Sequence, residues 1–505
     1  MKKTLSIILA IAMIAAMALP MGIFASAEEV VEVATWADFV TACEGNYGEG
    51  SYKLTADVTA DTPISSFTGI FDGNGHTVHV AATMFLDVST GAVIKNFTTQ
   101  LADIDVDNGD GTTSKLQMST NPIVDMISGS TADFPVTLEN ITNNVEVIET
   151  AADQEAIGGI AGKVDADNYI IAKKLVNNAN IATNDQAGGI FGNTGHARGH
   201  LFLLAANIVN NGNVWSSKNY AGGIVGNSND SLTATFSYCF NNGDITAEND
   251  AGGILGHVGG NVSEVTFNYC ASTGTICNNP VIDPETGAKL AGTDKTAPKY
   301  GAGGIFTRSD SAAGIITINN CVVTGAFTPD TTVDETGAVT ASGSSDPFSA
   351  FNGGGLVTIT DCTYLYGMHV IGEQAATLAE GASGFTAQDQ VACDALIAAM
   401  MENKETADPG SFGGEGSDEG DDQTTAPDDD QTTAPDVDQT TAPDADQTTA
   451  KPGDDTTAKP ADNTTKAPAT TTAASDDGCG SSISMAVVAI AAVSAVAVVA
   501  RKKED

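Results

Sequence analysis

Short runs of alternating hydrophobic and polar residues fill the middle of the chain, and they repeat with a period of about 30 residues. A run such as Thr235–Cys239 has the alternation of a β-strand with one buried face. Each repeat is centred on a glycine pair, and the pairs are Gly158–Gly159, Gly188–Gly189, Gly222–Gly223, Gly252–Gly253 and Gly303–Gly304. A repeat of this length cannot bury its own apolar face, so the period predicts stacked units.

Two apolar positions follow each glycine pair and are separated by a short polar run. The first position holds Ile141, Leu175, Ile208, Cys239, Cys270, Cys321 and Cys362, and the second holds Val147, Ile181, Val214, Ile245, Ile276, Phe327 and Met368. These two ladders predict an all-β fold, a right-handed parallel β-helix (solenoid) with rungs ~4.8 Å apart. We place the glycine pairs at its corners, because positive φ angles cost glycine little.

Several copies of the repeat resemble the GLUG repeats of bacterial cell-surface adhesins, in which Gly-Gly-Leu-Val-Gly precedes a Tyr/Cys-x-Asn-x-Gly-x-Val strand. The copies that carry the resemblance are Gly223–Asn227 with Gly243–Ile245, and Gly253–Gly256 with Gly274–Ile276. Upstream, Trp36–Phe39 and Phe67–Val78 resemble the opening segment of the same extracellular β-helix proteins. The resemblance covers residues 31–370 and implies a β-helix of a surface adhesin, although a fold does not fix an activity.

Both ends of the chain have the features of targeting segments. Lys2 and Lys3, an apolar run and the small residues Ala25–Ala27 predict a signal peptide over residues 1–27. The apolar run Ile483–Ala500 is followed by Arg501–Lys503, which predicts one transmembrane helix with a basic cytoplasmic tail within residues 478–505. We therefore expect a single-pass, membrane-anchored cell-surface protein with an extracellular N-terminal domain.

A low-complexity segment, residues 405–477, precedes the expected membrane anchor. It is rich in Thr, Pro and Asp and repeats Gln-Thr-Thr-Ala-Pro from Gln423, Gln431 and Gln439. Such a composition has too little apolar surface to form a core, so a disordered spacer is predicted. The formal net charge of −43 argues against nucleic acid as a partner, because phosphate binding needs positive charge.

The repeats are expected to form the β-helix over residues 67–370, between an N-terminal cap, residues 28–66, and a C-terminal helical cap, residues 371–404. Thr35–Cys43 predicts a short helix with its first residue as N-cap, and Thr386–Asn403 predicts a longer one. We expect these helices at opposite ends of the rod, because open sheet ends invite pairing with other chains.

Four of the eight cysteines belong to the first apolar ladder: Cys239, Cys270, Cys321 and Cys362. We interpret them as small buried apolar residues, since Ile and Leu fill the same position elsewhere. Disulfides between neighbouring rungs remain an alternative, because stacking brings equivalent residues within bridging distance.

Polar side chains recur four residues beyond the second glycine of each pair, and they are the candidate ligand-binding residues Lys163, Asn193, Asn227, His257 and Arg308. On a stacked rod they would line one edge. They could form a polar groove for a sugar chain or a protein strand, but we favour solvated turns beside the glycine corners. Trp215 and Tyr220 flank one corner and are added as candidates for stacking on a sugar, although core packing is the commoner fate of tryptophan.

No catalytic residue, cofactor or metal site is assigned. His196 and His200 lack the glutamate of a zincin, and Asp103–Asp110 lacks the closing Glu of an EF-hand loop. Gly413–Asp418 matches one solitary calcium-binding nonapeptide unit. The nucleophile elbow, the P-loop and the signatures of β-helix polygalacturonases are missing from the repeats.

The expected function is adhesion or interaction, with a glycan or a host or bacterial surface protein as partner. The insertions Asn278–Lys299 and Thr328–Phe348 suit either ligand binding or surface decoration. Two alternatives stay open: a polysaccharide lyase or hydrolase built on a β-helix, and a structural envelope protein.

Overall fold

The computed structural model describes most of the chain between residues 29 and 412. The described ranges are 29–149, 156–195, 199–229, 231–260, 264–278, 301–309, 314–328, 331–333, 339–341, 344–346, 348–352, 356–365 and 385–412. The expected signal peptide, the expected membrane span and nearly all of the expected spacer lie outside them. Among the helices in these ranges, none has the length and apolar character needed to cross a bilayer.

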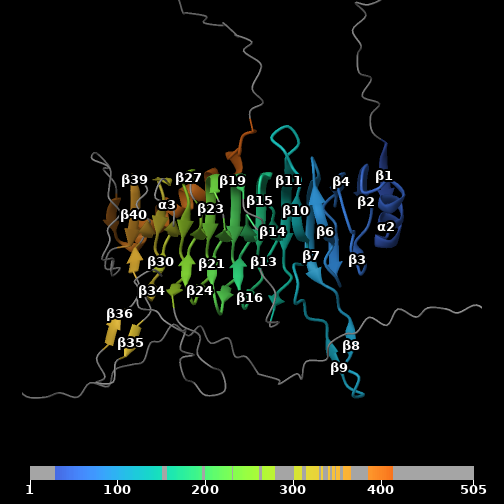
Figure 1. The fold of residues 1–505 in the computed structure, drawn as a ribbon, viewed down its shortest axis with the longest axis horizontal. Helices are drawn as coiled ribbons and strands as arrows, with labels where there is room; N and C mark the ends of the chain where they lie inside the picture. The colour runs from blue at the N-terminus through green and yellow to red at the C-terminus, as the bar shows by residue number, and fades with distance from the viewer. Residues whose placement is uncertain are drawn as a thin grey trace, which may run out of the picture. The chain divides into compact units, whose positions relative to one another are not determined.

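Most strands of the described chain are parallel, and they form four sheets (Figure 1). Sheet 1 contains β1 (Val30–Val33), β2 (Ser51–Leu54), β3 (Val58–Ala60), β4 (Ile70–Asp72), β5 (Thr77–Val80), β7 (Val93–Leu101), β11 (Val136–Asn143), β15 (Tyr169–Asn177), β19 (His200–Asn210), β23 (Ser231–Asn241), β27 (Glu264–Asn268), β28 (Ala271–Ser272), β32 (Ile315–Asn319), β33 (Val322–Val323), β39 (Leu356–Thr360), β40 (Cys362–Leu365) and β41 (Phe385–Gln388). Sheet 2 contains β6 (Phe85–Ser89), β10 (Val124–Ser128), β14 (Ala161–Val164), β18 (Phe191–Thr194), β22 (Val225–Ser228), β26 (Leu255–Val258), β31 (Phe306–Ser309) and β38 (Ser349–Asn352).

Two narrower sheets complete the turns. Sheet 3 contains β12 (Val147–Ile148), β16 (Ile181–Thr183), β20 (Val214–Ser216), β24 (Ile245–Ala247), β29 (Ile276–Asn278) and β34 (Phe327–Thr328). Sheet 4 contains β13 (Ala156–Gly158), β17 (Gln186–Gly188), β21 (Tyr220–Gly222), β25 (Asp250–Gly252), β30 (Gly301–Gly303) and β37 (Ser344–Asp346). Two antiparallel hairpins project from this framework: β8 (Asp105–Asp107) with β9 (Thr113–Lys115), and β35 (Thr331–Val333) with β36 (Val339–Ala341).

The chain visits the four sheets in a fixed order and then begins again one rung further on. It runs from β15 in sheet 1 through β16, β17 and β18 and returns to sheet 1 as β19. Each strand pairs in parallel with its counterpart in the next turn, so Ile170 lies beside Leu203. The described chain is therefore a parallel β-solenoid, as the repeat predicts. Parallel pairing already begins between β1 and β2, so the expected boundary at residue 67 falls inside the stack.

The first predicted apolar ladder lines a large core, whereas the second is divided: its Val147 and Ile181 lie in that same core and its later members in a smaller one. Ile141, Leu175, Ile208 and the cysteine ladder belong to a large core between sheets 1 and 2. Val214, Ile245 and Ile276 pack with the alanines of sheet 4 in a smaller core between sheets 3 and 4. Met368 lies outside the described residues. The described cysteines are thiols rather than disulfides, and burial raises the pKa of the Cys239 and Cys321 thiols well above the ordinary value.

Close approach of backbones, rather than positive φ, requires the glycine pairs. The described glycines with positive φ include no member of these pairs, so our explanation from φ is wrong. A Cβ on Gly188 would lie 1.7 Å from the carbonyl oxygen of Phe191 in sheet 2. A Cβ on Gly189 would lie 2.1 Å from the carbonyl oxygen of Gly223 in the next rung. Glycine is needed here because sheet 4 touches sheet 2 through bare backbone.

Buried asparagines form a ladder at the junction between the two cores. The Nδ2 of Asn143 donates to Asn177 (2.9 Å), Asn177 to Asn210 (2.8 Å), and Asn210 to Asn241 (2.8 Å). Each Nδ2 also donates to a backbone carbonyl two residues further along the chain. All four side chains are fully buried, so these shared amides satisfy polar groups that would otherwise be costly to bury.

Sheet 1 has a corner at which one residue per rung adopts left-handed backbone geometry. These residues are Asn96, Asn140, Lys174, Asn207, Tyr238, Tyr269, Asn320 and Asp361, with φ between 51° and 62°. Asn and Asp tolerate this region better than other non-glycine residues. Each left-handed residue directly precedes a residue that points into the large core, such as Ile141 after Asn140. The corner therefore interrupts the in–out alternation of the strand and divides the outer face of sheet 1 into two parts.

The N-terminal helix closes the first rungs, as expected. It is α2 (Trp36–Gly45), and the hydroxyl of its N-cap Thr35 accepts from the Asp38 N–H at 3.1 Å. Trp36 and Phe39 are buried among core aromatic rings, with the Phe39 and Tyr52 centroids 5.1 Å apart. Figure 1 shows α2 beside β1 and β2. Aromatic packing of this kind shields the first rungs from pairing with another chain.

The C-terminal helix covers a side of sheet 1 rather than its far end, so the expected cap position is wrong. It is α3 (Gln390–Asn403), which begins later than Thr386 because residues 385–388 form β41 and pair with β40. Its Cys393 and Met400 pack on an apolar column of the outer face, made of Val209, Phe240, Ala271 and Val322. The η1 turn (Lys404–Thr406) and residues 407–412 continue along sheet 1. We call residues 390–412 the strap.

Candidate functional site

The predicted polar stripe is one continuous column of sheet 2. The register pairs Lys163 with Asn193, Asn193 with Asn227, Asn227 with His257, and His257 with Arg308. These residues lie in strands and not in solvated turns, so the interpretation that we favoured is wrong. Asn193 and Asn227 are fully buried, His257 and Arg308 nearly so, and Lys163 is half-buried. The cause is sheet 4, whose strand beginnings lie against this column.

Most side chains of the polar stripe are engaged by sheet 4. Asn227 Nδ2 donates to Gln186 Oε1 at 3.1 Å, and His257 Nδ1 lies 2.7 Å from Asn227 Oδ1. Arg308 forms an ion pair with the fully buried Asp250, with an N–O distance of 3.4 Å. The amide of Asn193, by contrast, has no hydrogen-bond partner for either of its polar atoms in the described chain. The stripe is therefore mainly an internal network that joins sheets 2 and 4.

The geometry of the stripe does not resemble a compact catalytic centre. Lys163 and Arg308 are four rungs apart, which corresponds to ~19 Å at the spacing of parallel strands. Paired carboxylates of glycoside hydrolases lie roughly 5 to 10 Å apart. Asp165 is half-buried beyond Lys163, while Asp310 lies outside the described residues. The stripe thus offers no pair of acid and base groups across one bond.

The two aromatic candidates lie on different sheets. Tyr220 begins β21 in sheet 4, and its ring stacks on the imidazole of His257 with centroids 4.2 Å apart. Trp215 lies in β20 of sheet 3, where it is half-buried beside Ala182 and Thr246 of the neighbouring rungs. Tyr220 thus packs on the polar stripe, which the sequence analysis did not predict, while Trp215 belongs to another face.

The weak metal motifs gather no ligand set in the described chain. Asp103 and Asp105 both pair with Lys115, at 2.6 and 2.8 Å, in the hairpin β8–β9. Asp110 accepts from the backbone and hydroxyl of Thr112. His196 and the segment Gly413–Asp418 lie outside the described residues. The acidic loop is therefore held by its own lysine and its own turns.

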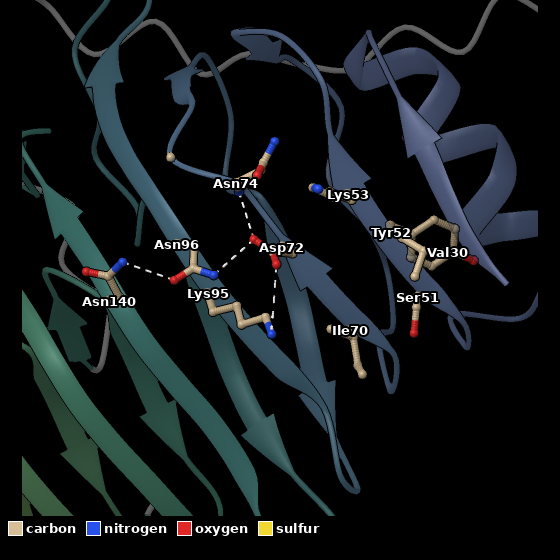
Figure 2. A pocket seen from close by; sticks show the side chains of 11 residues that line it. Val30, Ser51, Tyr52, Lys53, Ile70, Asp72, Asn74, Lys95, Asn96 and Asn140 are labelled. Atoms are coloured by element: carbon tan, nitrogen blue, oxygen red, sulfur yellow. Dashed lines mark hydrogen bonds and ion pairs between the residues drawn. The ribbon is translucent and has the colours of Figure 1, made fainter. Parts of the chain in front are cut away.

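A polar hollow of about 430 Å³ opens on the outer face of sheet 1 near the first rungs, and the sequence analysis missed it (Figure 2). Strands β2, β4 and β7 and the corner residue Asn140 line it; we call the outer face of β2, β4, β7 and β11 the N-terminal face. Its polar lining residues include Lys53, Asp72, Asn74, Lys95, Asn96 and Asn140. The side chains come from neighbouring rungs far apart in sequence, so only the register brings them together.

Hydrogen bonds fix the floor of this hollow. Asn140 Nδ2 donates to Asn96 Oδ1 (3.0 Å), and Asn96 Nδ2 donates to Asp72 Oδ1 (3.0 Å). The backbone N–H of Asn74 donates to the same Asp72 oxygen at 2.8 Å, while Lys95 Nζ lies 3.8 Å from the other oxygen. Figure 2 shows these contacts converging on Asp72. Asn74, Asn96 and Asn140 all adopt left-handed backbone geometry.

An aromatic column borders the N-terminal face. The rings of Tyr169 and Phe202 stack with centroids 4.3 Å apart, and His200 stacks on Phe202 at 4.4 Å. The strap ends here, because the ring of Phe412 packs edge-on against Tyr169 at 5.1 Å. The N-terminal face and the strap therefore meet at β15.

Charges anchor the strap where it crosses the corner. Lys404 Nζ donates to Asn207 Oδ1 at 3.1 Å, and Glu405 lies 3.3 Å from Lys174 Nζ. The hydrogen bond from Lys404, supported by Asn207 and Lys174, lowers the pKa of the Glu405 carboxyl from 4.5 to about 2. Residues 405–412, which were expected to belong to the spacer, are thus part of the strap.

Comparisons with known proteins give no family. No family model matches the chain, and no curated protein matches it. Among solved structures, one match is the crystal structure of a protein from Bacteroides ovatus described as a "putative immunoglobulin A1 protease". The identity is 14%, the TM-score is 0.36, and the alignment covers 74% of this chain and 88% of that one. A similarity at this level assigns neither an activity nor a partner to this chain.

Proposed function

We propose that the protein is a cell-surface interaction protein of the adhesin type, which binds a glycan or a surface protein through the N-terminal face. The observation that carries the proposal is the preorganised polar hollow on that face. Ligand sites in proteins are concave and hold a few fixed polar groups, as this hollow does through Asp72, Asn96 and Asn140. The strap covers apolar columns further along sheet 1 but does not reach these rungs.

The sequence supports the wider setting of this proposal. The GLUG-like repeats, the apolar N-terminal segment 1–27 and the apolar run Ile483–Ala500 together suit an anchored surface protein. The finer fold is proposed to be a right-handed parallel β-helix, the hand that parallel crossover connections almost always adopt. The acidic segment would then hold the solenoid away from the membrane as an extended tether.

The test is an array of glycans and extracellular matrix proteins probed with the full-length chain, with the same arrays assayed for product release. We expect binding without product release. A matched chain with Asp72→Asn and Asn140→Gly should lose the binding, because the first change removes the carboxylate that holds Asn74, Asn96 and Lys95 and the second removes an amide from the hollow. Gly at residue 140 keeps the left-handed backbone accessible. Product release would favour the enzyme alternative. The absence of both binding and product release on every array would favour a structural envelope protein.

A further inference from the structure

We infer that the hollow on the N-terminal face binds a sugar unit that carries a carboxylate, as uronic acids and sialic acids do. This inference rests on the proposed function, because it names the class of ligand for the same site. It is carried by one unpaired ammonium group, by a fixed set of amide and carboxylate groups, and by the size of the hollow.

The unpaired ammonium belongs to Lys53. The register places charged residues of alternating sign on one outward column: Glu32, Lys53, Asp72, Lys95, Glu139 and Lys173. Lys173 pairs with Glu139 at 3.1 Å, and Lys95 lies 3.8 Å from Asp72. Lys53 makes no hydrogen bond or ion pair with any described residue, although it lines the hollow. Among the described residues, Lys53 is therefore the charged group of the lining that forms no ion pair, although Glu32 and Asp72 lie on either side of it in the column.

The oxygen atoms of Asp72 are already occupied by protein donors. Its Oδ1 accepts from Asn74 and from Asn96, and its Oδ2 faces Lys95. The carboxylate therefore orients the amides and compensates Lys95, which leaves Lys53 to meet a ligand. An ammonium that meets a ligand carboxylate forms a charge-assisted hydrogen bond, which is stronger than a neutral one.

The amides provide hydrogen-bond acceptors for the hydroxyl groups of a sugar. Asn74 donates its Nδ2 to the Leu54 carbonyl, and Asn140 donates to Asn96, so the Oδ1 atoms of both residues remain available as acceptors for hydroxyls. Held amides of this kind cost little ordering entropy on binding. A ligand with several hydroxyls and one carboxylate matches this combination of acceptors and one ammonium.

The size and the charge of the hollow agree with this class. A volume of about 430 Å³ lies within the usual range for small-molecule sites and accommodates a short saccharide. Its charged lining, Lys53, Asp72 and Lys95, carries a net charge of +1 (two positive and one negative), in a chain with a net charge of −43. An anionic ligand is repelled by most of the chain, so a locally positive hollow would direct it to this place.

The test measures binding of the full-length chain to a glucuronate-containing oligosaccharide and to its carboxyl-reduced counterpart by calorimetry. A second arm compares sialyllactose with lactose, which separates the two sources of the carboxylate. We expect at least one acidic probe to bind about tenfold or more tightly than its neutral form, and to weaken with rising salt. Lys53→Gln should remove about tenfold of that preference without affecting the fold.

Lys173→Gln is the matched control, because it changes the net charge equally on the same column but lies outside the hollow. It should leave the preference for the acidic probe intact. Equal binding of acidic and neutral probes, an acidic preference that survives Lys53→Gln, or no binding of either acidic probe would overturn the inference. If array ligands of another kind still bind and depend on Asp72 and Asn140, the proposed function stands and only the ligand class is wrong.

Discussion

The same column of sheet 1 is polar in the N-terminal rungs and apolar from β15 to β33. Immediately after the core residues that follow the corner it carries Thr98 and Thr142, then Val176, Val209, Phe240, Ala271 and Val322, and finally Thr363. The strap packs on the apolar part, where Phe240 is only 1% exposed. No described element packs on the polar part, and the hollow opens beside it. The chemistry of the outward residues thus determines which rungs are covered and which stay available to a ligand.

The largest expected effect comes from a charge beneath the strap. Phe240→Asp would bury a carboxylate between sheet 1 and α3, so we expect the strap to detach, at a cost of roughly 3 kcal/mol or more. Hydrogen exchange across residues 390–412 would measure the detachment. Ser237→Asp is the control, because it lies on the same strand and outer face before the corner. Equal protection of the strap in both variants would contradict the division of sheet 1 into two parts.

A smaller effect is expected at the corner, which divides the outer face of sheet 1 within each rung. Asn320 has a φ of 52°, and a β-branched residue is strained in this geometry. We expect Asn320→Val to lower the free energy of unfolding by about 1 to 2 kcal/mol, and Asn320→Gly to change it by less. Urea unfolding followed by circular dichroism would compare the two. A larger loss for glycine than for valine would show that the corner does not depend on left-handed geometry.

The charge anchor of the strap should be sensitive to acid. The pKa of Glu405 is about 2 in the folded chain and 4.5 when unperturbed, so its contribution is complete above pH 4.5 and is lost as the pH falls towards 2. Glu405 is mostly exposed, so solvent screening should limit this contribution to under about 1 kcal/mol. Proteolysis of the strap by pepsin between pH 5 and 2 would measure it. Glu405→Gln should remove this pH dependence, and an unchanged profile would contradict the assignment.

The smallest effect is expected on the bare N-terminal face. Lys53 has no partner among the described residues, so Lys53→Gln should change the free energy of unfolding by less than about 0.5 kcal/mol. Thermal unfolding of the variant and the parent chain would measure the difference. A substantial loss of stability would mean that Lys53 has a structural role, and it would weaken its assignment to a ligand.

Sequence reasoning predicts the repeating framework well, because the first-ladder residues and the sheet 3 positions repeat in every turn. It also finds the column from Lys163 to Arg308, since equivalent residues of a solenoid must stack. Sequence reasoning wrongly predicts that this column is exposed to solvent, because nothing in a single repeat shows that sheet 4 packs against it. It likewise assigns the glycine pairs to positive φ, although their true requirement is contact between the backbones of different rungs.

The hollow could not be predicted from the sequence, for a related reason. Lys53, Asp72 and Lys95 are spaced irregularly along the chain, and their alternation of charge appears only once the strands are in register. The strap was missed although a signal for it exists. From Val176 to Val322, apolar residues occur on both faces of the strand after the corner, and a second apolar face predicts a covering element.

The most direct test of the central claim is hydrogen exchange of the full-length chain with and without its tightest array ligand. The account predicts slowed exchange in β2, β4 and β7 and at the corner near Asn140, with the strap and sheets 3 and 4 unchanged. Protection confined to residues 156–309, with none in the N-terminal face, would contradict it and place the binding surface elsewhere on the solenoid.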